Sequence, residues 1–208
     1  MKHVTIQPAT EDVAAGGVPV QPRGHHWRPT GPATIVWIEA LDGGDPTREV
    51  ENRDRVMMLE APFTGRPKRV TTLENRFSKI YWGETRNTAL VREYDSSRSW
   101  YNTWLVDPDN PDIPDRLLWS HSVNERYEHP GFPLMRQLPN GKRAMRVHSN
   151  SIFLNGNGSS VEGDRPFLDK LNLVKFEREH LFKCDEFSYE AVVALLSDDG
   201  SEYVTRHE

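Results

Sequence analysis

The sequence has a single cysteine, Cys184, and no long apolar run. One thiol cannot form a disulfide within the chain, so the fold does not depend on such a bond. No apolar run approaches the ~20 residues of a membrane-spanning helix, and the opening MKHVTIQPAT lacks the apolar core of a secretory signal. We therefore expect a soluble protein without a membrane partner, and assign no compartment, because the printed start need not be the native one.

An excess of positive charge is also missing. The 26 Lys and Arg residues are outnumbered by 31 Asp and Glu residues, which gives a formal net charge of −5. A nucleic-acid-binding surface needs clustered positive charge, and the sequence contains no strongly basic run. This balance argues against nucleic acid as a partner.

Short strand-like runs separated by turn sequences fill most of the chain. Runs such as ATIVWIEAL, FSKIYWG and TALVREYD alternate with turns such as LDGGD, PDNPDIPD and PNGK. The pattern predicts an all-β fold. The stretch LDKLNLVKFEREHLF also fits an amphipathic helix, but Asn172 in its middle favours two strands joined by a charged turn.

Three segments share one pattern of apolar strand, polar turn and apolar strand. Taking Leu59, Leu105 and Leu171 as equivalent positions, the successive spacings are 46 and 66 residues. The first spacing matches the ~40–50 residues of a four-stranded propeller blade. The longer second spacing indicates an insertion, which we place in the glycine-rich stretch near residues 149–165.

These patterns give a domain organisation. Residues 1–32 are rich in Gly and Pro and are expected to be a linker or an extended segment leading into the fold. Residues 33–208 are expected to form a partial β-propeller of about three to four four-stranded antiparallel blades, with a loop-dominated insertion at about 149–165 and a strand resuming at Pro166 to Leu173. A seven- or eight-bladed ring needs ~315 to 360 residues, so open blade edges and self-association through them are expected.

Several segments also resemble a known family. The segments VWIEALDGGDP, RFSKIYWGE and above all FLNGNGSSVEGDRPFLDKLNL are similar to the β-propeller of the prolyl oligopeptidase family of serine peptidases, in its glutamyl endopeptidase-like branch. The resemblance extends from about residue 24 to the C-terminus. It implies a propeller that precedes an α/β-hydrolase domain, and that domain carries the Ser, Asp and His triad. The propeller itself holds none of the three.

A catalytic serine is not expected in this chain. No GxSxG motif occurs, and Ser159 and Ser160 lie in GNGSSVEG, where glycine has the wrong spacing and no helix can follow cleanly. The resemblance therefore implies a non-catalytic propeller portion, inactive alone, that restricts peptide access to a catalytic domain absent from these residues. The alternative is a free-standing propeller that acts as a binding or scaffolding module.

Arg165 is the one candidate for substrate recognition. By resemblance, a glutamyl endopeptidase must recognise an acidic side chain, and arginine is the natural bidentate partner of a carboxylate. The competing interpretation is an internal ion pair of Arg165 with Glu162, Asp164 or Asp169.

The other motifs are interpreted as turns and not as ligand-binding sites, and neither a cofactor nor a metal is expected. PNGKR has Arg143 where a phosphate loop needs Ser or Thr, so it is interpreted as a β-turn. Pro111 takes the third ligand position of a calcium-like loop whose acidic residues are Asp107, Asp109 and Asp112.

The histidines and tryptophans are interpreted in the same way. His25 and His26 are adjacent and point to opposite faces of a strand, and His180 follows Glu177 in a charged turn. The sequon that begins at Asn157 matters only in a glycosylating compartment. Four tryptophans are expected to be apolar anchors between blades, namely Trp37, Trp82, Trp104 and Trp119.

Overall fold

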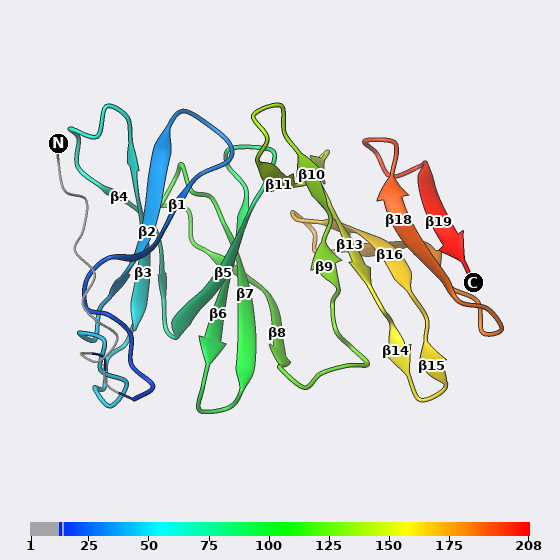
Figure 1. The fold of residues 1–208 in the computed structure, drawn as a ribbon, viewed down its shortest axis with the longest axis horizontal. Coiled ribbons are helices and arrows are strands. Elements are labelled where there is room, and N and C mark those ends of the chain that lie inside the picture. The colour runs from blue at the N-terminus through cyan, green and yellow to red at the C-terminus, as the bar shows by residue number, and fades with distance from the viewer. Residues whose placement is uncertain (1–12, 14) are drawn as a thin grey trace.

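The computed structural model describes residue 13 and residues 15–208, and every regular element in this part of the chain is a β-strand. The sheets lie side by side along the longest axis of the molecule (Figure 1). Within the described residues we find no helix that is long and apolar enough to cross a membrane. The all-β prediction is confirmed.

The first sheet contains four consecutive antiparallel strands in the order β1-β2-β3-β4. Val36 and Ile38 of β2 belong to a buried core, whereas Trp37 between them points to the other face, as alternation along a strand requires. The strands are β1 (Arg23–Trp27), β2 (Thr34–Ala40), β3 (Asp54–Glu60) and β4 (Lys68–Leu73).

The second sheet repeats this meander in the order β5-β6-β7-β8, again with antiparallel neighbours. Its central strand β6 is buried at Ala89, Leu90 and Val91, as expected for a strand with a packed layer on both faces. The strands are β5 (Arg76–Trp82), β6 (Ala89–Asp95), β7 (Trp100–Val106) and β8 (Arg116–Ser122).

The third sheet follows the order β12-β13-β16-β17, and β9 (Phe132–Pro133) adds to one end of β13. Its main strands are β12 (Val147–His148), β13 (Ser151–Gly156), β16 (Phe167–Asn172) and β17 (Arg178–Lys183). The two strands predicted in LDKLNLVKFEREHLF are therefore confirmed as β16 and β17. Beyond β13 and β16, the short strands β14 (Ser159–Ser160) and β15 (Gly163–Asp164) pair with each other.

Two further hairpins complete the described strands. One pairs β10 (Met135–Gln137) with β11 (Arg143–Met145), and the other pairs β18 (Glu190–Leu195) with β19 (Tyr203–His207). The three larger sheets and the final β18–β19 hairpin thus stand in sequence order, as blades of a partial β-propeller do, and the β10–β11 hairpin lies between the second and third sheets in the sequence (Figure 1).

The predicted repeat is confirmed at single-residue level. Leu59, Leu105 and Leu171 lie in β3, β7 and β16, which are each the third strand of their meander. Each leucine is also the next-to-last residue of its strand. Their antiparallel partners are equivalent as well, because each is the second residue of the second strand: Ile35, Leu90 and Ile152.

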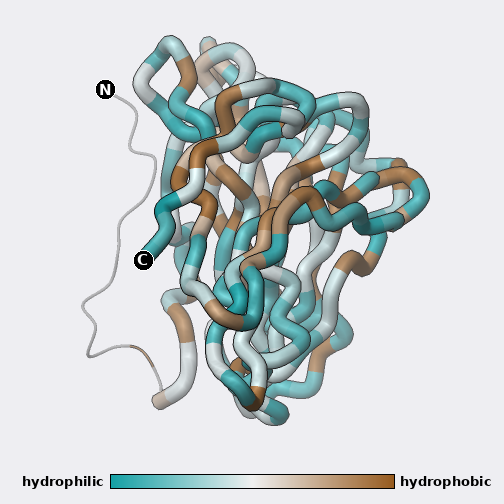
Figure 2. The backbone as a smooth tube through the Cα atoms, turned by 90° about the vertical axis from the view of Figure 1, so that its right-hand side faces the viewer, coloured by the Kyte–Doolittle hydropathy of each residue, from teal (hydrophilic) through white to brown (hydrophobic). Residues whose placement is uncertain are grey.

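Apolar side chains hold neighbouring sheets together. One buried cluster joins the first and second sheets, and it comprises Val36, Ile38, Val56, Met58, Val70, Leu73, Trp82, Ala89, Val91 and Val106. A second cluster joins the second and third sheets through Tyr81, Leu90, Met145, Ile152, Leu154, Leu171 and Leu173. Figure 2 shows apolar segments within the strands and hydrophilic segments at many of the turns. The burial favours association of adjacent sheets by about 25 cal/mol per Å² of apolar surface.

The tryptophan prediction is confirmed at three of its four positions. Trp82 lies in the cluster between the first two sheets, and Trp104 packs against it. Trp119 packs against the cluster between the second and third sheets. Trp37 is buried but belongs to neither cluster, because it lies on the other face of β2, where its indole donates a hydrogen bond to Glu39.

The predicted loop-dominated insertion at 149–165 is wrong for much of its length. Residues 151–156 form β13, a central strand that pairs with both β12 and β16. Ile152, Phe153 and Leu154 are fully buried there, so their apolar burial outweighs the entropy cost of the glycines that follow. The extra length between the second and third repeats lies mainly in residues 123–146, which contain β9, β10 and β11. The strand expected from Pro166 begins one residue later, at Phe167.

The boundary predicted at residues 32 and 33 falls inside the first sheet. Residues 23–27 form β1, which pairs with β2, so the described part of the predicted linker already contributes a strand. Gly24 has a φ of 64° at an irregularity in this pairing, which explains why the glycine-rich sequence resembled a linker. Residues 1–12 and 14 of the predicted linker lie outside the described residues.

Candidate functional site

The hairpin that carries Arg165 extends from the third sheet. β13 and β16 pair from Ser151 opposite Asn172 up to Gly156 opposite Phe167, and the short β14–β15 ladder continues the same hairpin. Gly158 has a φ of 59°, and a Cβ at this position would lie 2.1 Å from the carbonyl oxygen of Arg165. Only glycine fits this close approach, so the local sequence fixes where Arg165 leaves the sheet.

Both serines of the hairpin form local hydrogen bonds. The Ser159 hydroxyl donates to Asp164 at 2.8 Å, and the Ser160 hydroxyl donates to the carbonyl oxygen of Gly163 at 2.8 Å. Nucleophilic catalysis needs a hydroxyl whose proton is taken by a base such as histidine. Each hydroxyl here instead ties β14 to β15.

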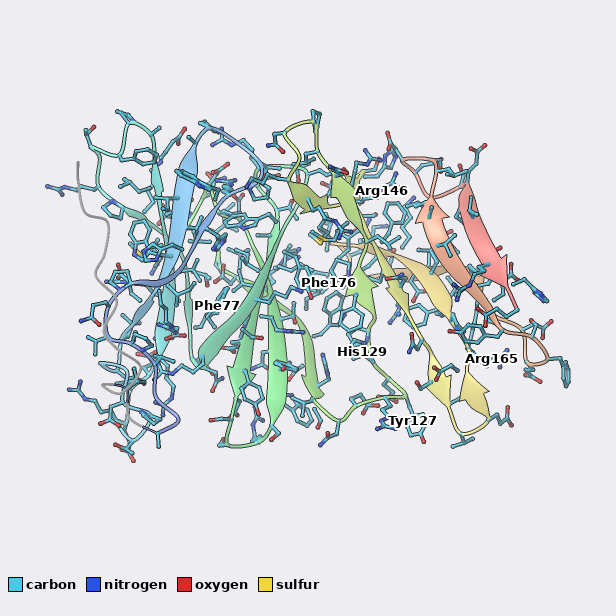
Figure 3. The ribbon with its side chains drawn as sticks, in the orientation of Figure 1. Phe77, Tyr127, His129, Arg146, Arg165 and Phe176 are labelled. Carbon is cyan, nitrogen blue, oxygen red and sulfur yellow. The ribbon has the colours of Figure 1, made fainter. Side chains whose placement is uncertain are left out.

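Arg165 contacts the segment that follows β17. Its Nε donates to the carbonyl oxygen of Cys184 at 3.2 Å, and its Nη1 lies 3.2 Å from Oε1 of Glu186. Figure 3 shows Arg165 beside the β14–β15 hairpin and near β18. Its side chain is 27% exposed, so the guanidinium remains accessible from solvent.

The internal ion pair therefore has a different partner from those considered in the sequence. Asp164 accepts from Ser159, and Asp169, which is fully buried, is bound by Arg178 and His180. The predicted ion pair of Arg165 with Asp169 is wrong, because Asp169 lies within β16 and faces β17. Recognition of a substrate carboxylate by Arg165 stays a prediction.

A shallow groove lies beside this hairpin. Two hollows of about 140 and 170 Å³ adjoin, because both are lined by Phe132, Gly156, Asn157 and Phe167. One hollow reaches Tyr189 in the segment before β18, and the other reaches His129 in the segment before β9. Figure 3 labels His129 close to β9. The groove therefore presents aromatic faces, backbone and an amide side chain, and the charged residues Glu125 and Arg126 line its His129 end.

His129 belongs to a row of rings that leads into the groove. Its ring centroid lies 5.1 Å from that of His121 and 4.8 Å from that of Phe132, and His121 in turn lies 6.1 Å from Tyr101. Burial, followed by the neighbouring His121 and Arg92, lowers the pKa of the His129 imidazole. A neutral imidazole between aromatic rings suits stacking contacts with an uncharged ligand segment.

The histidine and the serine that line the groove are each bound by a local partner. Nδ1 of His129 accepts a hydrogen bond from the amide of Gly131 at 3.0 Å, while the nearby Ser159 hydroxyl donates to Asp164. No hydrogen bond joins a serine hydroxyl to a histidine among the residues that the structure describes. The groove can therefore hold an extended peptide segment through aromatic and amide contacts.

The three acidic residues of the calcium-like loop have different contacts. Asp107 accepts backbone amides of Asp109 and Asn110 and closes a turn, whereas Asp109 binds arginines and Asp112 is exposed. In residue 13 and residues 15–208, no three or more His, Cys, Asp or Glu side chains converge as a metal site would require.

The remaining motifs are also placed by the structure. The PNGK segment is a turn between β10 and β11, as predicted, in which the amide of Leu138 donates to the carbonyl oxygen of Lys142. His26 lies at a β1 irregularity and its Nε2 accepts from Trp82 at 3.3 Å. His180 contacts Asp169 at 2.6 Å and not the exposed Glu177, which lies near Lys175.

A buried ion network between the first two sheets was missed in the sequence. Asp54 is fully buried and accepts from Arg23, from Arg76 at 2.9 Å and from the amide of Phe77 at 2.7 Å. Arg76 also binds Asp42, which is fully buried in the turn after β2. The available signal is weak: the charged residues of RDRV and ENRF lie at the ends of strands, where charges are normally solvated.

Comparison with known proteins places the chain. It is 36% identical over 206 residues to the probable chloroplastic glutamyl endopeptidase of Oryza sativa subsp. japonica, and 33% identical over 207 residues to the protein of the same name in Arabidopsis thaliana. Each alignment covers 92% of this chain and 21% of the relative, so the chain spans about a fifth of the length of these relatives. No family model matches the chain.

Two solved structures align with part of the chain. The β-propeller domain of the trilobed protease from Pyrococcus furiosus, described as having an open velcro topology, matches 78% of this chain and 44% of its own with a TM-score of 0.42 and 15% identity. An oligogalacturonate lyase in complex with manganese matches 78% of this chain and 36% of its own with a TM-score of 0.39 and 16% identity.

Proposed function

We propose that this chain is a non-catalytic propeller portion of a prolyl oligopeptidase-family serine peptidase. The chain is homologous to a segment that makes up about a fifth of the length of each plant relative, both of which are named as probable chloroplastic glutamyl endopeptidases. In this role it restricts which peptides reach an α/β-hydrolase catalytic domain. The observation that carries the proposal is identity of 36% along 92% of the chain. The blade repeat and the locally bonded serines support a structural, non-catalytic contribution.

Physical exclusion gives this proposal its mechanism. A blade is rigid because apolar clusters fix it against its neighbours, so a peptide reaches a covered active site only if it is narrow or unfolded enough to pass. A folded protein has to open locally first, and the free energy of that opening ranges from near zero at frayed ends to the full unfolding free energy in the core. The selectivity therefore arises from size and disorder of the substrate and not from the chemical step.

A chimera tests the proposal. In the rice relative, the homologous segment is replaced by this chain in one variant and deleted in a second. We expect the chimera to cleave a short fluorogenic Glu-containing peptide and to spare a folded protein substrate. The deletion variant should no longer discriminate and should cleave both substrates. An unchanged ratio of kcat/KM for the two substrates after deletion contradicts the restricting role. The isolated chain is expected to hydrolyse neither substrate and to take up no fluorophosphonate probe at Ser159 or Ser160.

A free-standing binding or scaffolding propeller is the second candidate, and the aromatic groove beside His129 supports it. This candidate requires a ligand that binds the isolated chain with no hydrolase domain present. Self-association through open edges is a related proposal, because β19 is the outer strand of a two-stranded sheet and Val204 within it is 42% exposed. Sedimentation velocity of the purified chain over a range of concentrations tests it.

A further inference from the structure

A separate cavity of about 360 Å³ opens between the first and second sheets. Its volume falls within the range of small-molecule pockets, about 300–1,000 Å³. Its charged lining comes from the segment after β1, the β3–β4 hairpin, the β5–β6 loop and the β7–β8 loop, and it consists of Arg28, Glu60, Arg66, Lys68, Arg86 and Asp109.

Arg28 is the most deeply placed of these charges. Its side chain is 2% exposed, and its guanidinium lies 5.3 Å from the ring centroid of Trp82. Nη1 donates to Asp109 at 2.7 Å and Nη2 donates to the carbonyl oxygen of Arg86. Its Nε is buried and has no hydrogen-bond partner among the described residues. An unpaired buried donor on a charged group is unfavourable unless a further acceptor arrives.

One carboxylate balances two arginines at this position. Asp109 accepts from Arg28 and also from Nε of Arg86 at 3.2 Å. Burial opposes ionisation of Asp109, but hydrogen bonds and charge from Arg28 and Arg86 outweigh it and lower the pKa of the carboxyl group. Asp109 therefore stays ionised near neutral pH and holds both guanidinium groups in fixed positions.

The rim of the cavity adds charge without an internal partner. Arg66 and Lys68 are exposed, and neither forms an ion pair within the described part of the chain. Glu60, also exposed, forms none there either. The lining thus has four cationic side chains and two carboxylates, although the whole chain has a net charge of −5. A concave surface with a local excess of one sign attracts ions of the other sign.

We infer that this cavity is a binding site for a small multivalent anion whose carboxylate or phosphate oxygens pair with its arginines. Guanidinium groups suit both kinds of oxygen because their donors form a planar fork. The inference does not rest on the proposed peptidase role, because all of the lining residues belong to this chain.

Isothermal titration calorimetry on the full 208-residue chain tests the site. The carboxylate probe is tricarballylate and the phosphate probe is inorganic phosphate, each titrated at pH 7 and constant ionic strength. The test variant is Arg66→Gln with Lys68→Gln, since both side chains are exposed and unpaired. The control variant is Arg126→Gln with Lys183→Gln, which removes the same charge from exposed positions that do not line the cavity.

We expect saturable binding of at least one probe and an affinity at least tenfold weaker in the test variant, with the control within twofold of the parent chain. Binding of tricarballylate alone assigns carboxylate oxygens, and binding of phosphate alone assigns phosphate oxygens. No saturable binding of either probe overturns the inference. An equal loss of affinity in both variants also overturns it, because the effect then follows net charge and not the cavity. Tryptophan fluorescence verifies that both variants retain the parent fold.

Discussion

Replacing Asp54 by Asn removes one negative charge from the junction of the first two sheets with little change in volume. The Asp54 carboxylate is fully buried and accepts three donors, from Arg23, Arg76 and the amide of Phe77. An amide offers one acceptor oxygen and places an NH₂ group toward the guanidinium groups. The variant therefore leaves buried positive charge only partly compensated.

The magnitude follows from how much compensation remains. Removing one partner of a buried ion pair costs about 3–5 kcal/mol. Arg76 keeps its second carboxylate, Asp42, and the Arg23 side chain is 15% exposed, so water reaches part of it. Both facts place the expected loss of unfolding free energy for Asp54→Asn at the lower end, about 3 kcal/mol. For a chain of this size, that corresponds to a fall in Tm of roughly 6–12 °C.

Urea unfolding followed by tryptophan fluorescence measures the change, because Trp82 and Trp104 lie at the same junction. Glu39→Gln is the matched control: it makes the same chemical change on the first sheet, but its ion pair with Arg55 is partly exposed, with side chains 25% and 43% accessible. The control should lose at most about 1 kcal/mol. If Asp54→Asn lies within about 1 kcal/mol of the control at equal m-value, the buried network does not couple the sheets as described.

Three further substitutions have defined outcomes. Burial raises the pKa of the Asp115 carboxyl group, so the stability that this group contributes is complete below pH 3.8 and is lost as pH rises through the folded pKa. Asp115→Asn should therefore raise Tm by up to about 2 °C at pH 7 but not at pH 3, and the control Asp112→Asn should leave Tm unchanged at both pH values. Gly158→Ala should cost at least about 2 kcal/mol in urea unfolding through its backbone clash, against about 1 kcal/mol for Gly141→Ala, which has positive φ but open space. In the full-length parent protein, Arg165→Ala should lower kcat/KM equally for Glu- and Gln-containing peptides; a loss of about 1.5–3 kcal/mol on the Glu peptide alone would establish recognition instead.

The repeat was predictable because each of its units has a local sequence pattern. An apolar strand followed by a polar turn is encoded within about ten residues, so the equivalent leucines at 59, 105 and 171 could be found without knowing any long-range contact. The position of the extra length could not be found in this way. Spacing gives the length of an insertion between two equivalent positions but not its place. The glycines at 156, 158 and 163 predict a loop there, although the extra length lies in residues 123–146.

The polar contacts between sheets were less predictable for a different reason. Arg28 and Asp109 are separated by 81 positions in the sequence, and Arg76 and Asp42 by 34. Charged residues at strand ends are usually solvated. The chain has 57 charged side chains, of which 26 are basic, and no local sequence feature distinguishes the buried ion-pair residues from the exposed ones. The partner of Arg165 was missed likewise, because Glu186 lies 21 positions away.

The attachment of the final hairpin differs from that of the complete sheets. The first three sheets share apolar clusters, whereas neither cluster includes a residue of the β18–β19 hairpin. The hairpin contacts the third repeat through Arg146, which donates to the carbonyl oxygens of Leu195 and Ser197 at 2.6 and 2.8 Å, and through Tyr203, whose ring centroid lies 6.0 Å from that of Phe182. Val193 and Val204 in this hairpin are 57% and 42% exposed. In stacked repeats each unit is stabilised mainly by its neighbours, so a unit with few apolar neighbours opens at the lowest free energy. Stability should therefore be graded along the chain, from the buried junction of the first two sheets toward β19, and any surface that covers these valines would strengthen the hairpin most.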